Sequence, residues 1–156
     1  MIRLRFALVY IFMSLMFLLS CAGNRTNNNT LNIDNQGMDS KRLVLEIGGK
    51  IQDVVWDDNR SVEALKNLAK DGLEILMSNY GGFEQVGELG QALPCEDKSM
   101  KTTFGDICLY SSDKLVIFYG SNSWSYTHLG MINLSEKKLK ELLDRQNIDV
   151  KLYMER

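Results

Sequence analysis

Histidine is nearly absent from this chain, which contains only His128. One histidine without clustered carboxylates provides no ligand set for a zinc site. Every Ser-His-acid arrangement would also have to share this residue, so the sequence indicates no catalytic triad. We therefore predict no metal and no cofactor, and we interpret His128 as a surface or hydrogen-bonded residue.

Basic residues are not in excess either. The chain has 18 lysines and arginines against 20 aspartates and glutamates, and two of the basic residues, Arg3 and Arg5, lie in the first 20 residues, which contain no acid. No cluster of lysine or arginine remains that could bind a phosphate backbone, which argues against a nucleic-acid partner. The rest of the composition, 45% hydrophobic and 24% charged with 1 proline, is typical of one globular domain, which we expect to be monomeric.

The N-terminal segment has the layout of a secretory signal, with a basic start and an apolar run over residues 6–19. This run is shorter than the roughly 20 apolar residues that span a membrane. It ends in Leu18-Leu19-Ser20-Cys21, which resembles the lipobox of bacterial lipoproteins, where cleavage precedes a cysteine that carries diacylglycerol. A cleaved secreted protein and a short membrane helix are the alternatives.

This pattern divides the chain into a signal peptide (1–20), a lipidated Cys21 with a flexible tether (21–40) and a folded domain (41–156). The tether is polar, without apolar periodicity, and cannot bury enough surface to offset its chain entropy. The predicted location is extracytoplasmic, with the domain anchored to a membrane by its lipid. Ala22 provides no aspartate retention signal after the cysteine, which favours the outer membrane in a cell that has one.

The folded domain alternates short apolar runs with turns. The pattern predicts strands at 42–47, 51–56, 73–77, 107–110, 115–119, 129–132 and 148–154, and helices at about 61–70 and 135–145. Gly48-Gly49 predicts a hairpin turn, Ser135 is expected to cap the second helix, and residues 95–104 are expected to form a polar loop. About eight strands, two helices and corner glycines indicate a mainly β fold, and a closed β-barrel rather than a sandwich.

Two stretches of the domain combine glycines with aromatic residues. The first covers residues 78–90, and the second begins as the strand 116–119, breaks at Gly120 and continues as a loop to residue 130. Their sequences, Tyr80-Gly81-Gly82-Phe83-Glu84 and Ile117-Phe118-Tyr119-Gly120-Ser121-Asn122-Ser123-Trp124-Ser125-Tyr126-Thr127, resemble the bacterial cyclophilin-like fold family. The resemblance covers about residues 42–154. It implies a cyclophilin-like β-barrel of eight strands capped by helices, and no settled function.

True cyclophilins isomerise peptidyl-prolyl bonds, with an arginine that hydrogen-bonds the prolyl nitrogen and weakens the amide resonance. The corresponding stretch here, around residues 77–84, contains no arginine, and the arginines of the domain lie outside both stretches. Peptidyl-prolyl isomerase activity therefore lacks its polarising cation unless His128 or a lysine replaces it. We assign no catalytic residue and keep isomerase activity as the alternative function.

The favoured function is non-catalytic binding of a peptide or small ligand. Aromatic side chains offer flat, amphipathic surface, and the polar residues beside them could orient a ligand. A purely structural role, with the aromatic residues packed at barrel corners, stays open. The predicted ligand-binding residues are Tyr80, Phe83, Glu84, Ser121, Asn122, Trp124 and Tyr126.

Two thiols, Cys95 and Cys108, remain once Cys21 is lipidated. Outside the cytoplasm they could form a disulfide. Cys108 lies in the predicted strand 107–110, where a small buried hydrophobic residue is the other interpretation.

Overall fold

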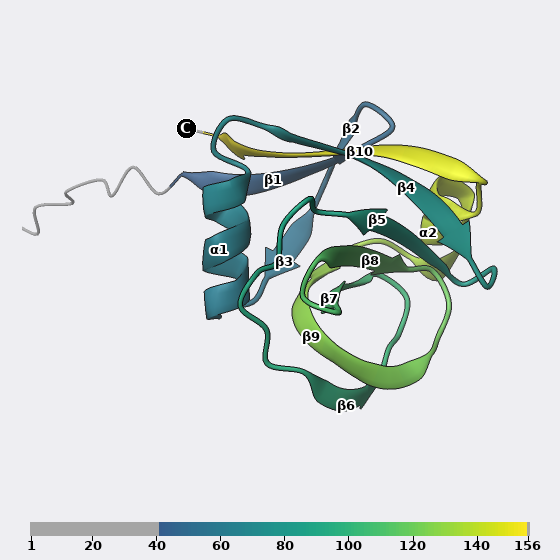
Figure 1. The fold of residues 1–156 in the computed structure, drawn as a ribbon. Coiled ribbons are helices and arrows are strands. Elements are labelled where there is room, and N and C mark those ends of the chain that lie inside the picture. The colour runs from purple at the N-terminus through teal and green to yellow at the C-terminus, as the bar shows by residue number, and fades with distance from the viewer. Residues whose placement is uncertain (1–40, 156) are drawn as a thin grey trace, which may run out of the picture. The chain divides into compact units, whose positions relative to one another are not determined.

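The computed structural model describes residues 41–155, and the predicted signal peptide, lipidated Cys21 and tether lie outside the described residues. Ten strands and two helices form a nearly closed barrel (Figure 1), which confirms the mainly β, cyclophilin-like barrel predicted from the sequence. Neither helix has the length and hydropathy to cross a membrane. The elements are β1 (Arg42–Ile47), β2 (Lys50–Gln52), β3 (Val54–Trp56), α1 (Arg60–Leu68), β4 (Leu73–Tyr80), β5 (Glu84–Glu88), β6 (Lys98–Lys101), β7 (Asp106–Tyr110), β8 (Lys114–Phe118), β9 (Ser123–Ile132), α2 (Glu136–Leu143) and β10 (Asn147–Glu155).

The strands form one antiparallel sheet in the order β2-β1-β10-β4-β5-β8-β7-β9-β3. Strand β6 lies off this path and pairs with β9. In Figure 1 β9 curls around β7 and β8, and β6 lies on the outer rim of that curl. Strand β9 therefore contacts three other strands along its length.

Alternate side chains of the sheet enter two apolar clusters. On β8, Leu115 and Ile117 belong to a larger cluster that both helices also join, while Val116 and Phe118 belong to a smaller one. In the smaller cluster Tyr126 packs against Phe118 with ring centroids 5.4 Å apart. A strand that is buried on both faces carries a continuous apolar run, which explains the apolar sequence of β8.

The two helices begin differently. Asn59 caps α1, because its Oδ1 accepts a hydrogen bond from Val62 N at 3.0 Å. Ser135 occupies the N-cap position of α2, as predicted, but its side chain makes no cap hydrogen bond. The Ser135 carbonyl still accepts the first helical bond, from Leu139 N at 2.9 Å.

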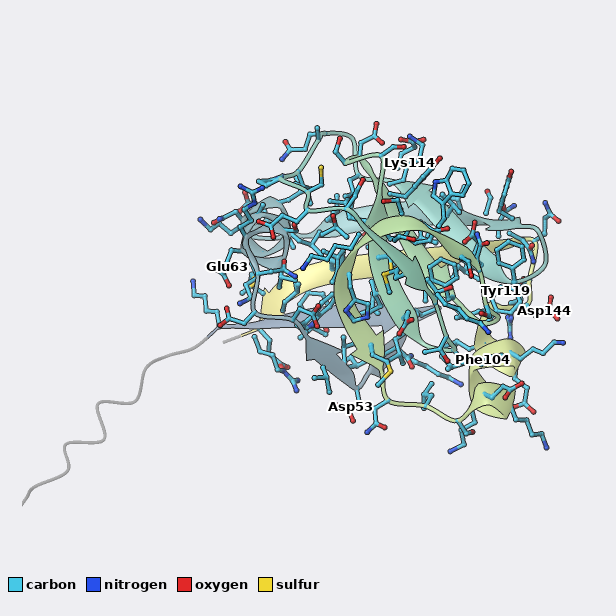
Figure 2. The ribbon with its side chains drawn as sticks, turned by 90° about the horizontal axis from the view of Figure 1, so that it is seen from below. Asp53, Glu63, Phe104, Lys114, Tyr119 and Asp144 are labelled. Atoms are coloured by element: carbon cyan, nitrogen blue, oxygen red, sulfur yellow. The ribbon has the colours of Figure 1, made fainter. Side chains whose placement is uncertain are left out.

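The predicted Gly48-Gly49 hairpin turn is confirmed, with both residues at positive φ between the paired Ile47 and Lys50. The strand predicted at 51–56 is instead two strands. Strand β2 pairs with β1 and β3 pairs with β9, at opposite ends of the strand order. The chain changes sheet edge at Asp53, which is labelled in Figure 2. This change of edge brings the two ends of the barrel wall together.

Three strands lie where the sequence predicted turns or loops. Strand β5 lies within the glycine-rich stretch 78–90, and β6 lies within the predicted polar loop 95–104. Strand β9 begins at Ser123, so most of the predicted loop with Trp124 and Tyr126 is a strand. Pairing with β6, β7 and β3 outweighs the local preference of its serines and glycine for turns.

Candidate functional site

A cavity of about 320 Å³ opens where β9 changes partners. Strand β9 pairs with β6 up to Tyr126 and with β3 from Gly130 onward. Between these two ladders, Thr127 and His128 form the floor of the cavity. One wall comes from residues 57–61, which join β3 to the first turn of α1, and the other comes from residues 96–100. Three distant segments thus converge on one concave site, as they do in many ligand pockets.

An extra residue in β9 lies directly beside the cavity. Ile107 of β7 lies opposite Gly130, whereas the next residue, Cys108, lies opposite His128. Leu129 is therefore inserted between them, and its side chain is fully buried in the larger cluster. Such bulges re-aim neighbouring side chains and are common beside functional sites. Here the bulge leaves Leu129 in the core and His128 in the cavity.

The His128 ring lies between two carboxylates. Its Nδ1 is 2.7 Å from Asp57 Oδ2, and its Nε2 is 3.5 Å from Asp106 Oδ1. The other oxygen of Asp106 accepts a hydrogen bond from Thr103 N at 2.8 Å. Asp106 is buried, whereas the Asp57 side chain is 39% exposed and lines the cavity. Of the two carboxylates, Asp57 is the one that a ligand can reach.

Hydrogen bonding to Asp106 and, to a smaller extent, to Asp57 raises the pKa of His128 to about 9, and burial opposes this rise. At neutral pH the ring is therefore an imidazolium. A ring that already carries both protons cannot act as a general base. The expected role of His128 is to hold the charge and geometry of the site.

Hydrogen bonds tie both walls to the floor. From one wall, Asn59 Nδ2 donates to the His128 carbonyl at 3.0 Å. From the other wall, Glu96 N donates to Thr127 Oγ1 at 2.7 Å, and Thr127 Oγ1 donates to Asp97 Oδ1 at 2.7 Å. Because these bonds fix main chain as well as side chains, the cavity is preformed.

The surface of the cavity is mixed in character. Met100 and Tyr126 contribute apolar area, and Lys98 contributes a cation. Arg60 joins the two walls through its Nε, 3.1 Å from Glu96 Oε1, but it does not itself line the cavity. Within residues 41–155 no arginine lies on the cavity surface, and no group of three or more His, Cys, Asp or Glu side chains is placed to hold a metal ion.

The two glycine-aromatic stretches lie side by side. Tyr119 N donates to the Phe83 carbonyl at 2.9 Å. Gly120 packs on the same residue so closely that an added Cβ would lie 2.6 Å from Phe83 Cβ. This contact explains why position 120 requires glycine. Tyr119 itself lies on the side of the barrel where α2 ends, near Asp144 (Figure 2).

Of the seven predicted binding residues, all within the described range, Tyr126 is the one that lines the cavity. Asn122 joins it, donating from Nδ2 to the Tyr126 hydroxyl at 3.0 Å. Ser121 Oγ donates to a main-chain carbonyl at 2.7 Å. Tyr80 and Trp124 are 66% and 59% exposed on the surface. The structure thus brings Asn122 into contact with Tyr126, outside the cavity lining, and leaves Tyr80 and Trp124 exposed to solvent.

Two more predicted binding residues, Phe83 and Glu84, belong to the interior. Phe83 is half-buried against the smaller cluster. Glu84 is 6% exposed, and its Oε2 has no hydrogen-bond partner in the part of the chain that the structure describes. Burial raises the pKa of Glu84 to about 7. The direct contact of these two residues with a ligand stays a prediction.

Both described cysteines are free thiols, so the disulfide considered from the sequence is not formed in this structure. Cys108 is fully buried in the smaller cluster, which confirms its interpretation as a small hydrophobic residue. Burial raises the pKa of its thiol. Cys95 is half-buried against the larger cluster.

The sequence indicated the segment that contains the cavity floor, but it did not predict most of the residues that line the cavity. His128 and Thr127 lie inside or next to the quoted motif, yet the sequence favoured a surface or hydrogen-bonded role for the histidine. Asp57 and Asn59 lie in the polar segment between a predicted strand and the first predicted helix, where the sequence indicated no site. The β6 residues carried no signal, because residues 95–104 read as a polar loop.

Comparison with known proteins supports the resemblance found in the sequence. Residues 45–155 match the sequence model of the Cyclophilin-like family. Comparison with curated proteins and with solved structures gives no match. The family match spans more than half of the chain and agrees with the barrel described above. The chain therefore belongs to the Cyclophilin-like family.

Proposed function

We propose that this domain binds an extended peptide or a small ligand in the cavity along β9, without catalysing a reaction. The observation that supports the proposal is the cavity itself, in which polar groups converge beside the apolar surface of Met100 and Tyr126. The Asp57 carboxylate, partly exposed and held by His128, is oriented to accept a hydrogen bond from a ligand N–H or O–H group.

Prolyl isomerase activity is the alternative, because true cyclophilins catalyse it. It requires a donor that approaches the prolyl nitrogen. The His128 imidazolium is the nearest substitute cation on the floor, but both of its ring nitrogens face carboxylates. Donating to a proline would break the 2.7 Å contact with Asp57. This geometry argues against His128 as the donor, so isomerisation would have to use Lys98, which lines a wall of the cavity.

The anchoring of the domain is part of the same proposal. The lipobox-like end of the apolar run places Cys21 as the lipidated residue and the domain outside the cytoplasm, at a membrane surface. Cys21→Ser should then release the protein from the membrane fraction. Unchanged membrane retention of this variant would contradict the lipid anchor and favour a spanning segment.

Amide chemical-shift mapping tests the binding proposal directly. We expect short extended peptides to shift the amide signals of Met100, Thr127 and His128 in a saturable way. Met100→Ala should weaken binding several-fold, because it removes apolar surface from the cavity wall. The binding free energy lost in this way is about 2 kcal/mol at most for a half-buried side chain. Leu76→Ala, at a residue 65% exposed on β4, is the matched control and should bind as the wild type does.

The wild type and its variants also test whether the domain catalyses prolyl isomerisation. Exchange spectroscopy on a proline-containing peptide measures its cis/trans exchange with and without the protein. We expect the uncatalysed rate. A faster exchange that Asp57→Asn or Met100→Ala abolishes would establish the isomerase alternative, and the absence of saturable shifts at the cavity would contradict the binding proposal.

A further inference from the structure

The outer edge of β6 carries no partner strand in the part of the chain that the structure describes. Strand β6 pairs with β9 on one side, over Lys98–Lys101. Figure 1 shows β6 on the rim of the curled β9, with no strand beyond it. Its first three residues also line the cavity. An unpaired edge therefore begins at the proposed ligand site.

The register shows which main-chain groups face outward. Lys101 lies opposite Ser123, and in the next pair Thr102 N donates to Asn122 O at 2.8 Å. Hydrogen-bonded and non-hydrogen-bonded pairs alternate along an antiparallel ladder. The N–H and C=O groups of Met100 therefore face β9, and those of Ser99 and Lys101 face away from it. Both Ser99 and Lys101 are exposed.

The charge of this edge is positive. Lys98 and Lys101 take part in none of the ion pairs within residues 41–155. The neighbouring acids are already engaged, Glu96 with Arg60 and Asp97 with the Thr127 hydroxyl. The two lysines are an odd number of positions apart, so their side chains leave opposite faces of the strand. An added strand would meet an ammonium group on each face.

From these observations we infer that β6 receives an extended acidic peptide as an additional strand, which runs from the cavity along the edge. This inference rests on the proposed binding function and names its partner chemistry. Main-chain groups of Ser99 and Lys101 would supply hydrogen bonds, and the two lysines would select carboxylate side chains. A second copy of β6 is a poor occupant, because it would bring four lysines onto one short ribbon.

The probe is a short fluorescent peptide in which pairs of glutamates alternate with pairs of threonines. Its binding to the full chain is measured by fluorescence anisotropy. We expect the double variant Lys98→Glu with Lys101→Glu to raise its Kd about tenfold, since two attractive charge pairs become repulsive. Lys137→Glu with Lys140→Glu, on the exposed side of α2, makes the same charge change and should leave the Kd unchanged. The peptide with lysine in place of glutamate should bind at least tenfold more weakly to the wild type.

Strand addition has a second signature in the main chain. Ser99→Pro removes an outward N–H that β9 does not use, so we expect the fold to persist and peptide binding to be lost. Ser99→Ala keeps this N–H and loses only a hydroxyl, so it should weaken binding much less than Ser99→Pro does. A peptide N-methylated on alternate amides tests the same bonds on the wild-type protein, and it should lose binding in one of the two methylation registers.

Three outcomes overturn the inference. Equal binding of both methylated registers, with shifts confined to Thr127 and His128, would leave the cavity proposal standing and remove strand addition. Binding that ignores the charge of the peptide would remove the acidic partner. If no peptide shifts any amide of the protein, the binding proposal and this inference both fail.

Discussion

Replacing Glu84 by glutamine should remove a loss of stability that the wild type undergoes as the pH rises from acidic to alkaline values. The carboxyl is buried, and burial raises its pKa from 4.5 to about 7. In the unfolded chain the group ionises near its ordinary pKa, so between these two values the unfolded state loses its proton first. The wild type therefore loses stability as the pH rises from about 4.5 to 7, and it keeps that deficit above 7. Glutamine cannot ionise and carries no such deficit.

The size of the effect follows from the same two values. One pKa unit corresponds to about 1.4 kcal/mol, so the rise of Glu84 to about 7 corresponds to roughly 3 kcal/mol of lost stability at alkaline pH. About 1 kcal/mol of this is already lost near pH 5, where the unfolded chain has begun to ionise. The variant should therefore gain about 2 kcal/mol over the wild type between about pH 5 and 9. A buried amide without partners adds a cost that does not vary with pH.

Urea unfolding, followed by the fluorescence of Trp56 and Trp124, measures both proteins across this pH range. His128 also makes the stability of the domain depend on pH: its pKa is raised to about 9, so its contribution is lost as the pH rises through that value. That loss is common to both proteins and cancels in the difference. Glu88→Gln, at an exposed residue of the same strand, is the matched control. A difference between wild type and Glu84→Gln that stays constant with pH would refute the reasoning.

The remaining predictions concern the site and its scaffold. Asn59→Ala should lower the free energy of unfolding by about 1–2 kcal/mol in urea titrations, because it removes a helix cap, whereas Ser135→Ala should cost less than about 0.5 kcal/mol, since its side chain makes no cap bond. Asp57→Asn should lower the pKa of His128 from about 9, as read from its ring-proton shifts in a pH titration; an unchanged value would mean that Asp106 alone sets it. Gly87→Ala should cost about 1–3 kcal/mol by overpacking, because its Cβ would lie 2.4 Å from a β4 side chain; an unchanged melting curve would contradict the close packing.

The parts of the fold that depend on local pattern were predictable from the sequence. The strand at 42–47 and the hairpin after it were recovered because alternation and two glycines determine them locally. The helix predicted at about 61–70 was recovered, over residues 60–68, because its apolar stripe lies within one segment. The fold class follows from the sum of such elements.

The strands that failed depend on partners that the sequence does not reveal. Strand β6 consists mainly of polar and charged residues, and three of its four residues are exposed. It forms a strand because it pairs with the edge of β9. The first half of β9 contains two serines, and only its ladder with β6 makes it a strand. Its Trp124 and Tyr126 do favour strands, and that weak signal was available.

The candidate site was hardest to predict because its centre results from a change of register. Asp57 lies 71 residues before His128 in the sequence, and Asp106 lies 22 residues before it. The three residues meet only because their segments converge at the bulge in β9. No spacing rule connects these residues. Motif resemblance therefore located the strand but not the charged trio on it.

The way β9 is shared explains why a ligand should matter for the stability of this barrel. The cavity exists because β3 and β6 pair with different ends of β9; one wall follows β3, and the other is formed by β6 and the residues just before it. A ligand that contacts both walls binds only when both ladders are formed. At a concentration one hundred times its Kd such a ligand stabilises the native state by about 2.7 kcal/mol. A peptide that pairs with β6 alone gives the same equilibrium stabilisation, but it protects the β6 and β9 amides from exchange and leaves those of β3 unaffected. Amide exchange with a bound peptide therefore separates a ligand held between the walls from one added to the edge.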